Sequence, residues 1–342
     1  MIRTERAHLL VAANTHPGMT GKQNEDRFAV TAYRVGVSNP TPSVFAVVAD
    51  GIGGHRAGEL AAEMAVNAVS HIVAQSDAFE PLATLQRAIQ EASQSIASQA
   101  QDDTQHLGMG TTCACAWVIG RRLYTASVGD SRIYLLRGAT IRQLTTDHTW
   151  IQEAIDKGIL NAEQAREHPN IHVIRRYLGS AKPPQADLRL RVRGDETDTQ
   201  AEANQGFLLH SGDRLLLCTD GLTDEANDEE IRLAALERGP SGGPGRDRSA
   251  GRARRRLAPA AQRLVDLANS RGGHDNITVV LMQVPGRPSR PPRRRPWRWV
   301  ALIAAALLLL LALAAGLIVL LLQPEVTTWP IVISPGLTGP TP

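Results

Sequence analysis

The sequence has little cysteine. Its 342 residues include only Cys113, Cys115 and Cys218. No C-x-x-C pair is present, which excludes the common zinc spacing, and the odd number excludes a framework built only of paired disulfides. Cys113 and Cys115 alternate along one apparent strand, so both are expected to face the same side of a sheet. We therefore predict reduced cysteines in a core, as is typical of a reducing compartment.

Aromatic residues are also scarce, at 4% of the chain. The net charge of +3 comes from two arginine-rich segments, 246–256 and 287–298, which hold twelve of the 37 basic residues and one of the 34 acidic residues. The rest of the chain keeps 25 basic and 33 acidic residues, a net charge of about −8. A groove for nucleic acid needs positive charge interleaved with aromatic rings. The composition therefore predicts no nucleic-acid partner.

One long apolar run is present, at 300–322. Its 23 residues carry no charge, and a helix of this length crosses a bilayer core of about 30 Å. Six arginines lie in 287–298 before the run, and the 20 residues of 323–342 after it include no Lys or Arg. The positive-inside rule predicts a single-pass cell-membrane protein with its N-terminal domain in the cytoplasm and a short tail outside.

The part of the chain before this run is predicted to form one folded domain, 1–285. Within it, 239–256 is a low-complexity insertion, and an Arg/Pro-rich juxtamembrane linker follows at 286–299. Segments that are typical of strands are 26–33, 43–50, 111–120, 122–130, 131–138, 214–221 and 276–284. Segments with helical spacing of apolar residues are 58–75, 81–100 and 259–269. Strands in runs and helices in pairs favour an α+β fold.

Three of the apolar segments carry an aspartate at one end. Asp50 and Asp220 each follow an apolar segment and precede a glycine. Asp275 comes just before the start of a third apolar segment. A single Asp-Gly is a common turn, but three strand ends of this kind suggest a shared site. Carboxylates without Cys or His favour Mg²⁺ or Mn²⁺. Two such ions can generate a hydroxide and hold the oxygens of an in-line displacement at phosphorus.

Seven segments resemble, in order across about residues 8–284, the motifs of the metal-dependent protein serine/threonine phosphatases, the protein phosphatase 2C family. The segments are NEDRF (24–28), VVADGIGGH (47–55), GTT (110–112), SVGDSRIYLLR (127–137), LTTDHTW (144–150), LCTDGLTD (217–224) and GGHDNITVV (272–280). The form DGIGGH is typical of bacterial members. The resemblance implies a four-layer αββα sandwich of two antiparallel sheets flanked by helix pairs, with metals in a cleft at one edge. One transmembrane helix is expected to follow.

The resemblance also implies a set of metal ligands. Asp50 would bridge two Mn²⁺ or Mg²⁺ ions, and the Gly51 carbonyl would bind one of them. Asp220 and Asp275 would complete the second ion's site. A metal-bridging hydroxide held by Asp50 would then attack phosphorus directly, without a phosphoenzyme.

Three further acids have motif positions. Glu25 and Asp26 would hold metal-bound waters or support the ligands, although plain surface charges are the alternative. Asp130 would help Asp220 to bind a weaker third ion, although Gly-Asp at a strand junction is also an ordinary hairpin turn.

Three histidines accompany these motifs. His55 stands three residues after the position at which animal members carry a catalytic histidine, so that role is not transferred, and a helix-start or surface role is expected. His148 opens a flap segment that borders the cleft, and helix packing and substrate contact are equally open for it. His274 is expected to pack or to face solvent.

The chain departs from the family at the position of a phosphate-binding arginine, which is Gly21 here. Lys22 is adjacent and offers a point charge, but a lysine is not equal to a bidentate guanidinium. If these residues formed a strand, Lys22 would face away from the site. Alternatively, Gly21 is required for a positive φ.

The sequence as a whole therefore predicts a membrane-anchored phosphatase acting on phosphoserine and phosphothreonine in proteins. Its partners would be serine/threonine kinases and their substrates. One alternative is a weakly active pseudophosphatase scaffold that binds phosphoproteins. Another is a dedicated signalling phosphatase of an anti-sigma-type pathway. No cysteine has the context of a covalent thiol phosphatase.

Overall fold

The structure, a computed structural model, describes residues 1–53, 56–102, 106–166, 168–237, 250–286 and 297–321. The chain divides into two compact units, Met1–Pro288 and Ser289–Pro342. In the second unit the described residues form one helix, α9 (Trp297–Leu321). Across the described ranges, no helix combines the length and the apolarity that a membrane crossing requires, so the predicted span at 300–322 is not supported.

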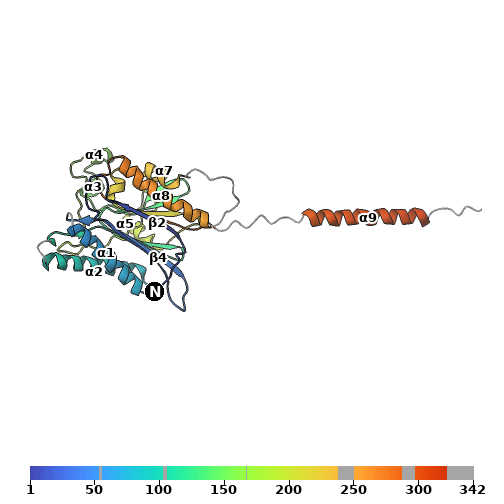
Figure 1. Ribbon diagram of the computed structural model, residues 1–342, viewed down its shortest axis with the longest axis horizontal. Coiled ribbons are helices and arrows are strands. Elements are labelled where there is room, and N and C mark those ends of the chain that lie inside the picture. Colours follow the sequence, from blue (N-terminus) through green and yellow to red (C-terminus); the bar gives the residue numbers. More distant parts are fainter. Residues whose placement is uncertain (54–55, 103–105, 167, 238–249, 287–296, 322–342) are drawn as a thin grey trace, which may run out of the picture. The chain divides into compact units, whose positions relative to one another are not determined.

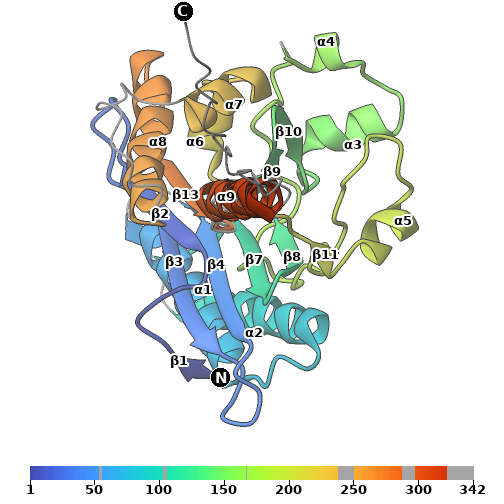
Figure 2. The same cartoon turned by 90° about the vertical axis from the view of Figure 1, so that its right-hand side faces the viewer.

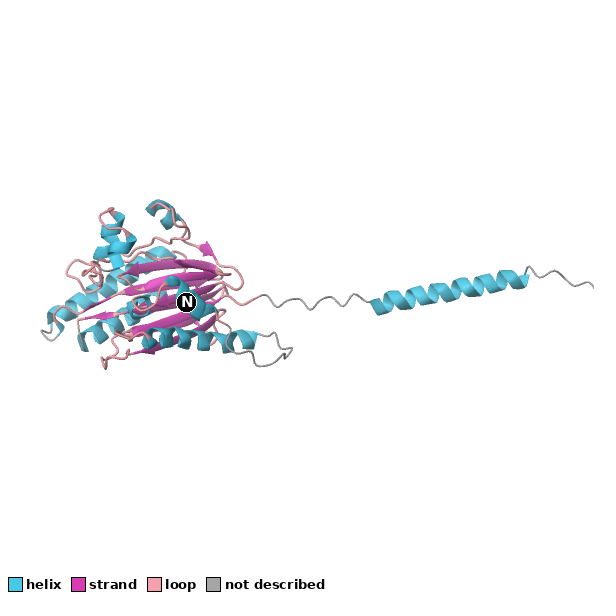
Figure 3. Cartoon of the chain, turned by 90° about the horizontal axis from the view of Figure 1, so that it is seen from above, coloured by secondary structure: helices cyan, strands magenta, loops and turns pink. Residues whose placement is uncertain are grey.

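The first unit contains two antiparallel sheets (Figures 1 and 3). The first sheet has the order β1 (Ile2–Arg3), β3 (Arg27–Arg34), β4 (Pro42–Ala49), β7 (Cys113–Ile119), β8 (Arg122–Val128) and β11 (Phe207–Leu208). The second has the order β10 (Thr140–Gln143), β9 (Arg132–Arg137), β12 (Arg214–Cys218), β13 (Ile277–Gln283) and β2 (Leu10–His16). A short separate pair joins β5 (Gly51–Ile52) to β6 (Gly110–Thr111).

Helices cover the outer face of each sheet (Figures 1 and 2). The first sheet packs against α1 (Arg56–Gln75) and α2 (Pro81–Asp102). The second packs against α6 (Asp220–Thr223), α7 (Asp228–Leu236) and α8 (Ala250–Ser270). Three short helices lie between β10 and β11 in the chain: α3 (Trp150–Asp156), α4 (Ala162–Arg166) and α5 (Asp198–Ala203). The predicted α+β sandwich of two antiparallel sheets with helices on both sides is confirmed for this unit.

Strand β4 shows why the layers form. Successive side chains of a strand point to opposite faces. Phe45 and Val47 accordingly pack among α1 and α2, whereas Val44 and Ala46 pack against the second sheet. All four are fully buried. A strand covered on both faces is apolar along its whole length, which is why this segment lacks the alternation of polar residues that a solvent-facing strand shows.

Helix α8 begins earlier than the sequence predicted. It starts at Ala250 and has Pro259 inside it, so the predicted low-complexity insertion at 239–256 overlaps its first turns. Alanine and arginine are strong helix formers, and together they extend the helix despite the one backbone donor that proline lacks. The rest of that insertion and most of the 286–299 linker lie outside the described residues.

The three cysteines are buried and free of disulfides, as predicted. Cys113 and Cys115 lie on the same face of β7, with their Sγ atoms 3.5 Å apart.

Candidate active site

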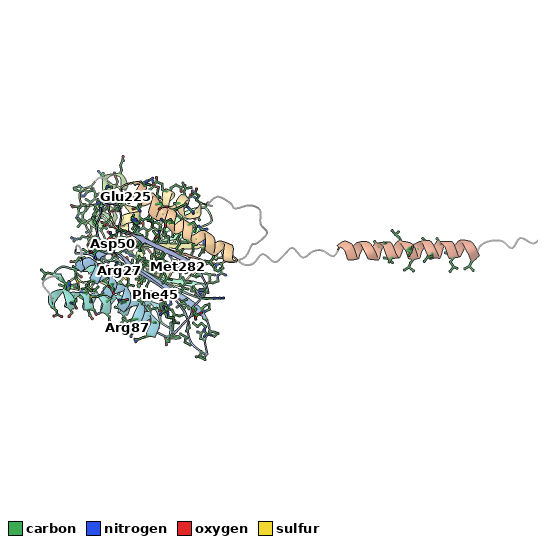
Figure 4. All side chains as sticks on the ribbon, in the orientation of Figure 1. Arg27, Phe45, Asp50, Arg87, Glu225 and Met282 are labelled. Carbon is green, nitrogen blue, oxygen red and sulfur yellow. The ribbon has the colours of Figure 1, made fainter. Side chains whose placement is uncertain are left out.

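Two strand ends place Asp50 and Asp220. Asp50 follows β4, and Asp220 begins α6 after β12. The Asp50 N–H donates to Thr112 Oγ1 (2.9 Å), and the Asp50 carbonyl accepts from Thr111 Oγ1 (2.7 Å) and from the Thr112 N–H (2.9 Å). Figure 4 shows Asp50 toward the left end of the sandwich, with Phe45 and Met282 further along the strands. The GTT segment therefore fixes the backbone on which the Asp50 carboxylate is carried.

The glycine after each aspartate is required by close backbone packing. A Cβ at Gly51 would lie 2.3 Å from the Gly58 carbonyl oxygen, and one at Gly221 would lie 2.0 Å from the Asn276 carbonyl oxygen. Real Cβ atoms do not approach backbone oxygens so closely, so neither position accepts a side chain. Each glycine thus allows its strand end to pack closely against other backbone, Gly51 against Gly58 of α1 and Gly221 against the residue before β13.

Glu25 and Asp26 lie beside these strand ends. Asp26 is 2% exposed, and its Oδ2 accepts a hydrogen bond from Thr219 Oγ1 at 2.8 Å. Glu25 is half-buried, and its N–H donates to Asn276 Oδ1 at 2.7 Å. The alternative that both are plain surface charges is therefore wrong for Asp26.

Asp130 is also buried at this edge. It is 7% exposed, and its Oδ1 has no hydrogen-bond partner. The hairpin alternative is wrong, because β8 belongs to the first sheet and β9 to the second. Asp130 lies where the chain crosses between the sheets, after Gly129 with φ +100°.

The buried acids share one region of low solvation and repel one another. Burial raises the pKa of Asp50 well above its usual range, and the charges of Asp220 and Asp26 add to the effect. Burial likewise raises the pKa of Asp26 to about 7 and raises the pKa of Asp220. Burial, followed by the charge of Asp220, raises the pKa of Asp130. Like charges brought together out of water favour the neutral forms unless a cation joins them.

The chemistry of this donor set fits a hard divalent cation. Asp26 Oδ1, Asp130 Oδ1 and Asp220 Oδ1 are buried without hydrogen-bond partners, and buried polar atoms are ordinarily satisfied. The donors are all oxygens, which suit Mg²⁺ or Mn²⁺. Among the residues that the structure describes, no three His, Cys, Asp or Glu side chains are already arranged to hold a metal ion. The fit therefore rests on chemistry and proximity rather than on preformed coordination.

Asp275 and Lys22 lie at the exposed side of the same region. The Asp275 side chain is 53% exposed, and its Oδ1 is 3.4 Å from Lys22 Nζ. Gly21 has φ +76°, with open space around the position of a Cβ. Neither Gly21 nor Lys22 lies in a strand, so the strand alternation that would turn Lys22 away from the site does not apply here. The positive φ of Gly21 supports the alternative that this glycine serves the backbone.

Three cavities follow this edge in succession. One of about 300 Å³ is lined by Lys22, Glu25, Asp50 and Asp275 among others. A second, of about 360 Å³, shares Lys22, Asp50 and Asp275 with it and adds Asp220. A third, of about 530 Å³, shares Asp220 with the second and adds Asp130. A fourth, of about 720 Å³, is formed by 3–7, 9–11 and 30–32 and contains none of these acids.

The two histidines that the structure describes near these motifs, His148 and His274, contact neighbouring protein groups. His148 is 4% exposed, its Nδ1 accepts the Gly129 N–H at 3.0 Å, and its Nε2 lies 3.0 Å from Asp187 Oδ2. It holds the segment that carries Asp130 and is not available to a substrate. His274 is exposed, and its Nδ1 lies 2.6 Å from Glu225 Oε1. His55 lies outside the described residues.

Sequence reasoning missed the hydroxyl groups that support the acids. Thr219 binds Asp26, and Thr112 Oγ1 lies 2.7 Å from Ser131 Oγ. All three hydroxyl residues lie inside the motifs: Thr219 and Ser131 are each next to an aspartate, and Thr112 belongs to GTT. Their position in the motifs was the signal that could have identified them. It also missed the Arg132–Asp147 pair, in which Arg132 Nη2 is 2.7 Å from Asp147 Oδ2.

Comparison with known proteins gives a consistent result. The family described as protein phosphatase 2C matches residues 18–239. The serine/threonine phosphatase stp of Listeria innocua is 35% identical over 277 residues, 79% of this chain and 93% of its own length. The serine/threonine protein phosphatase PstP of Mycobacterium tuberculosis is 33% identical over 276 residues, 81% of this chain, but the match spans only 45% of PstP.

A solved structure extends the likeness to three dimensions. The catalytic domain of the serine/threonine protein phosphatase PstP, in complex with two manganese ions, matches with a TM-score of 0.62 and 30% identity. The match covers 80% of this chain and 97% of that domain. From the family match, the two relatives and the shared fold, we conclude that the chain belongs to the protein phosphatase 2C family.

Proposed function

We propose that this chain hydrolyses phosphoserine and phosphothreonine esters in proteins with the help of two Mn²⁺ or Mg²⁺ ions. The observation that carries the proposal is the group of buried carboxylates at one edge of the sandwich, three of which have an oxygen without a hydrogen-bond partner. The names of the relatives, which are serine/threonine phosphatases, and the two manganese ions in one of them support it.

Each acid has a role in this proposal. The Asp50 carboxylate, the Gly51 carbonyl and the carboxylates of Asp220 and Asp275 would together hold the two ions. When bound, the ions would supply an activated water and would neutralise charge on the phosphoryl oxygens.

Supporting residues would keep these ligands in place. Asp26 is oriented by Thr219, and Glu25 is anchored through its backbone to Asn276. Both would support the ligands through hydrogen bonds, as residues behind metal ligands commonly do. Asp130 would contribute, with Asp220, to a weaker third ion.

Lys22 would take the place of the missing arginine at the substrate phosphate. It is the one Lys or Arg side chain in the two cavities that contain Asp50, as far as the structure describes them. The nearby Arg27 is occupied, because it donates to the carbonyls of Asn24 and Asp26 and pairs with Glu59. An ammonium group binds a phosphate oxygen as a point charge rather than through a bidentate fork.

The test uses the purified full chain with an aryl phosphate and with a phosphothreonine protein. We expect hydrolysis of both with Mn²⁺, and loss of hydrolysis on chelation. Activity that survives complete chelation would contradict the metal proposal. Tight binding of phosphoproteins without turnover would support the pseudophosphatase scaffold instead.

The physiological substrates are proposed to be targets of serine/threonine kinases, or the kinases themselves. A dedicated substrate in an anti-sigma-type pathway is the second candidate, and Gly21 favours it, because docking contacts would compensate for a missing phosphate-binding arginine. Comparing turnover of a kinase-derived phosphopeptide with that of a folded phosphoprotein distinguishes the two. A dedicated enzyme prefers the folded partner.

The cellular location stays a prediction from the sequence alone. The arginines of 287–298 and the apolar run 300–322 predict a membrane-held chain with the catalytic domain in the cytoplasm, and the described helices give this no support. Separating membranes from the soluble fraction tests it, with a chain lacking 287–342 as the control.

A further inference from the structure

The cavity of about 530 Å³ adjoins the proposed metal site. It shares Asp220, Asp224 and Glu225 with the cavity that contains Asp50 and Asp275. A peptide whose phosphate lies near Asp50 therefore has a continuous route for a neighbouring side chain into this space.

One part of the cavity wall is apolar. Ile151 and Ile155 reach it from α3, and Ile171 reaches it from the segment that follows α4. All three are half-buried, so they offer hydrocarbon surface that an incoming side chain would cover. Such a wall suits a long aliphatic stem.

The arginines in the lining are already neutralised. Arg132 forms a two-pronged pair with Asp147, with contacts of 2.7 and 2.9 Å to Oδ2. Arg271 pairs with Glu230 through both of its terminal nitrogens. These two pairs add no net charge to the cavity.

Asp224 and Glu225 carry the charge that is left once the metal ligands are set aside. Their charged or titratable partners are histidines: Asp224 Oδ2 is 3.1 Å from His172 Nδ1, and Glu225 Oε1 is 2.6 Å from His274 Nδ1. Among the residues that the structure describes, neither carboxylate forms an ion pair with a lysine or arginine side chain. Two acids without a basic side-chain partner therefore line the junction between the two cavities.

A second observation points to a positively charged ligand. Asp130 lines the same cavity, is 7% exposed and has no hydrogen-bond partner for its Oδ1. A carboxylate oxygen buried in this way would be satisfied by a positively charged group that reaches it through the cavity, which is either the third ion proposed above or the charged head of a substrate side chain.

We propose that this cavity binds the side chain of a lysine or arginine that flanks the phosphorylated residue of the substrate. The stem would lie along Ile151 and Ile155, and the charged head would meet the carboxylates of Asp224 and Glu225. This inference rests on the proposed function and adds a substrate class to it: phosphoproteins with a basic residue close to the phosphoserine or phosphothreonine.

The test measures kcat/KM of the full chain with Mn²⁺ on phosphothreonine peptides. A single arginine is moved through the flanking positions, and norleucine replaces it in the matched peptides. We expect one position at which arginine is preferred by roughly fivefold, the upper range for a solvent-accessible ion pair. Equal rates for all peptides would overturn the inference but leave the proposed function intact. Failure to hydrolyse any phosphate ester would overturn both.

Variants locate the preference. Asp224→Asn and Glu225→Gln should each reduce the arginine-to-norleucine ratio, and the ratio within one variant cancels any general effect on turnover. Glu229→Gln is the matched control, because Glu229 is an exposed acid of α7 outside the cavity lining. A ratio that survives both substitutions, or that disappears as Mn²⁺ is raised at constant ionic strength, would contradict the assignment. Loss of the preference at high Mn²⁺ would show that a metal ion, rather than a substrate side chain, occupies the cavity.

Discussion

The interior of the sandwich and its acidic edge differ in how their buried polar groups are hydrogen-bonded. In the interior, the Trp117 indole N–H donates to Ser43 Oγ at 2.7 Å, and the side chains around this pair are buried and apolar. At the edge, Asp26, Asp130 and Asp220 each keep an oxygen without a partner. The interior therefore supplies the stability that holds like charges together at the edge, where function needs them. Substitutions in the two regions should accordingly act in opposite directions on stability.

The largest effect is expected at the edge. Asp50→Asn should reduce kcat by at least about a hundredfold, because a neutral amide is a poor ligand for a divalent cation. The melting temperature measured without metal should stay level or rise, since one of several repelling carboxylates is removed. Steady-state kinetics and thermal melting of the same variant measure both. A strong loss of stability in the metal-free variant would remove the contrast between edge and interior.

A core substitution should show the reverse pattern. Leu216 is fully buried among the residues that join β12 to α8, so Leu216→Ala should lower the free energy of unfolding by about 2–5 kcal/mol. Urea unfolding measures this loss. Leu233→Ala, at a 54% exposed position of α7, is the control and should cost well under half as much. Equal costs at the two positions would show that the second helix layer is not packed as described.

The pH dependence of stability distinguishes Asp187, whose carboxylate is fully hydrogen-bonded, from the edge acids that keep an oxygen without a partner. Burial alone would raise the pKa of Asp187, but hydrogen bonds from His148 and Arg189 outweigh it and hold the pKa well below its usual range. The resulting stabilisation is present above the unfolded pKa of about 4 and is lost as pH falls toward the lower folded pKa.

Asp187→Asn should remove this part of the acid sensitivity. Between about pH 5 and pH 3 the unaltered chain should lose roughly 1–2 kcal/mol more stability than the variant does. Urea unfolding across that range measures the difference. Parallel pH profiles for the two proteins would mean that the Asp187 carboxylate is not specially stabilised in the folded state.

The smallest effect is expected at Gly21. Its φ of +76° lies in the left-handed region, so Gly21→Ala should cost about 1 kcal/mol of stability through backbone strain. Its KM for an aryl phosphate should hardly change, because a Cβ there meets open space. Gly36→Ala, also in open space but without a positive φ, is the control. A raised KM in Gly21→Ala would show that the loop positions Lys22 through this glycine.

The sequence was most informative where apolar residues form an unbroken run or recur at a strict period. The apolar run of β4 and the helical spacing of α1 and α2 predicted these elements, and the family resemblance implied the layers that they form. Strand β2 was missed because Ala12, Ala13 and Asn14 are weak strand formers and it lies at an edge of its sheet. The sequence did not indicate the early start of α8, because Pro259 and the low-complexity composition before it are typical of a helix boundary.

For the candidate site, the sequence identified the acidic residues but not the orientation of their neighbours. The motifs identified Asp50, Asp220 and Asp275, and the structure places the first two at adjoining strand ends. The direction of Lys22 could not be predicted, because it depends on one backbone dihedral at Gly21 rather than on a periodic pattern. The burial of His148 depends on Asp187, 39 residues later in the chain, and no local pattern carries such a contact.

Calorimetric titration of the full chain with Mn²⁺ tests the central claim most directly, because it does not depend on turnover. The account predicts binding of two ions to the unaltered chain, with a rise in melting temperature as Mn²⁺ is added, and weakened or lost binding in Asp50→Asn. Glu229→Gln should bind as the unaltered chain does. No binding to the folded chain, or equal binding by Asp50→Asn, would contradict the claim that the buried carboxylates form a divalent-metal site.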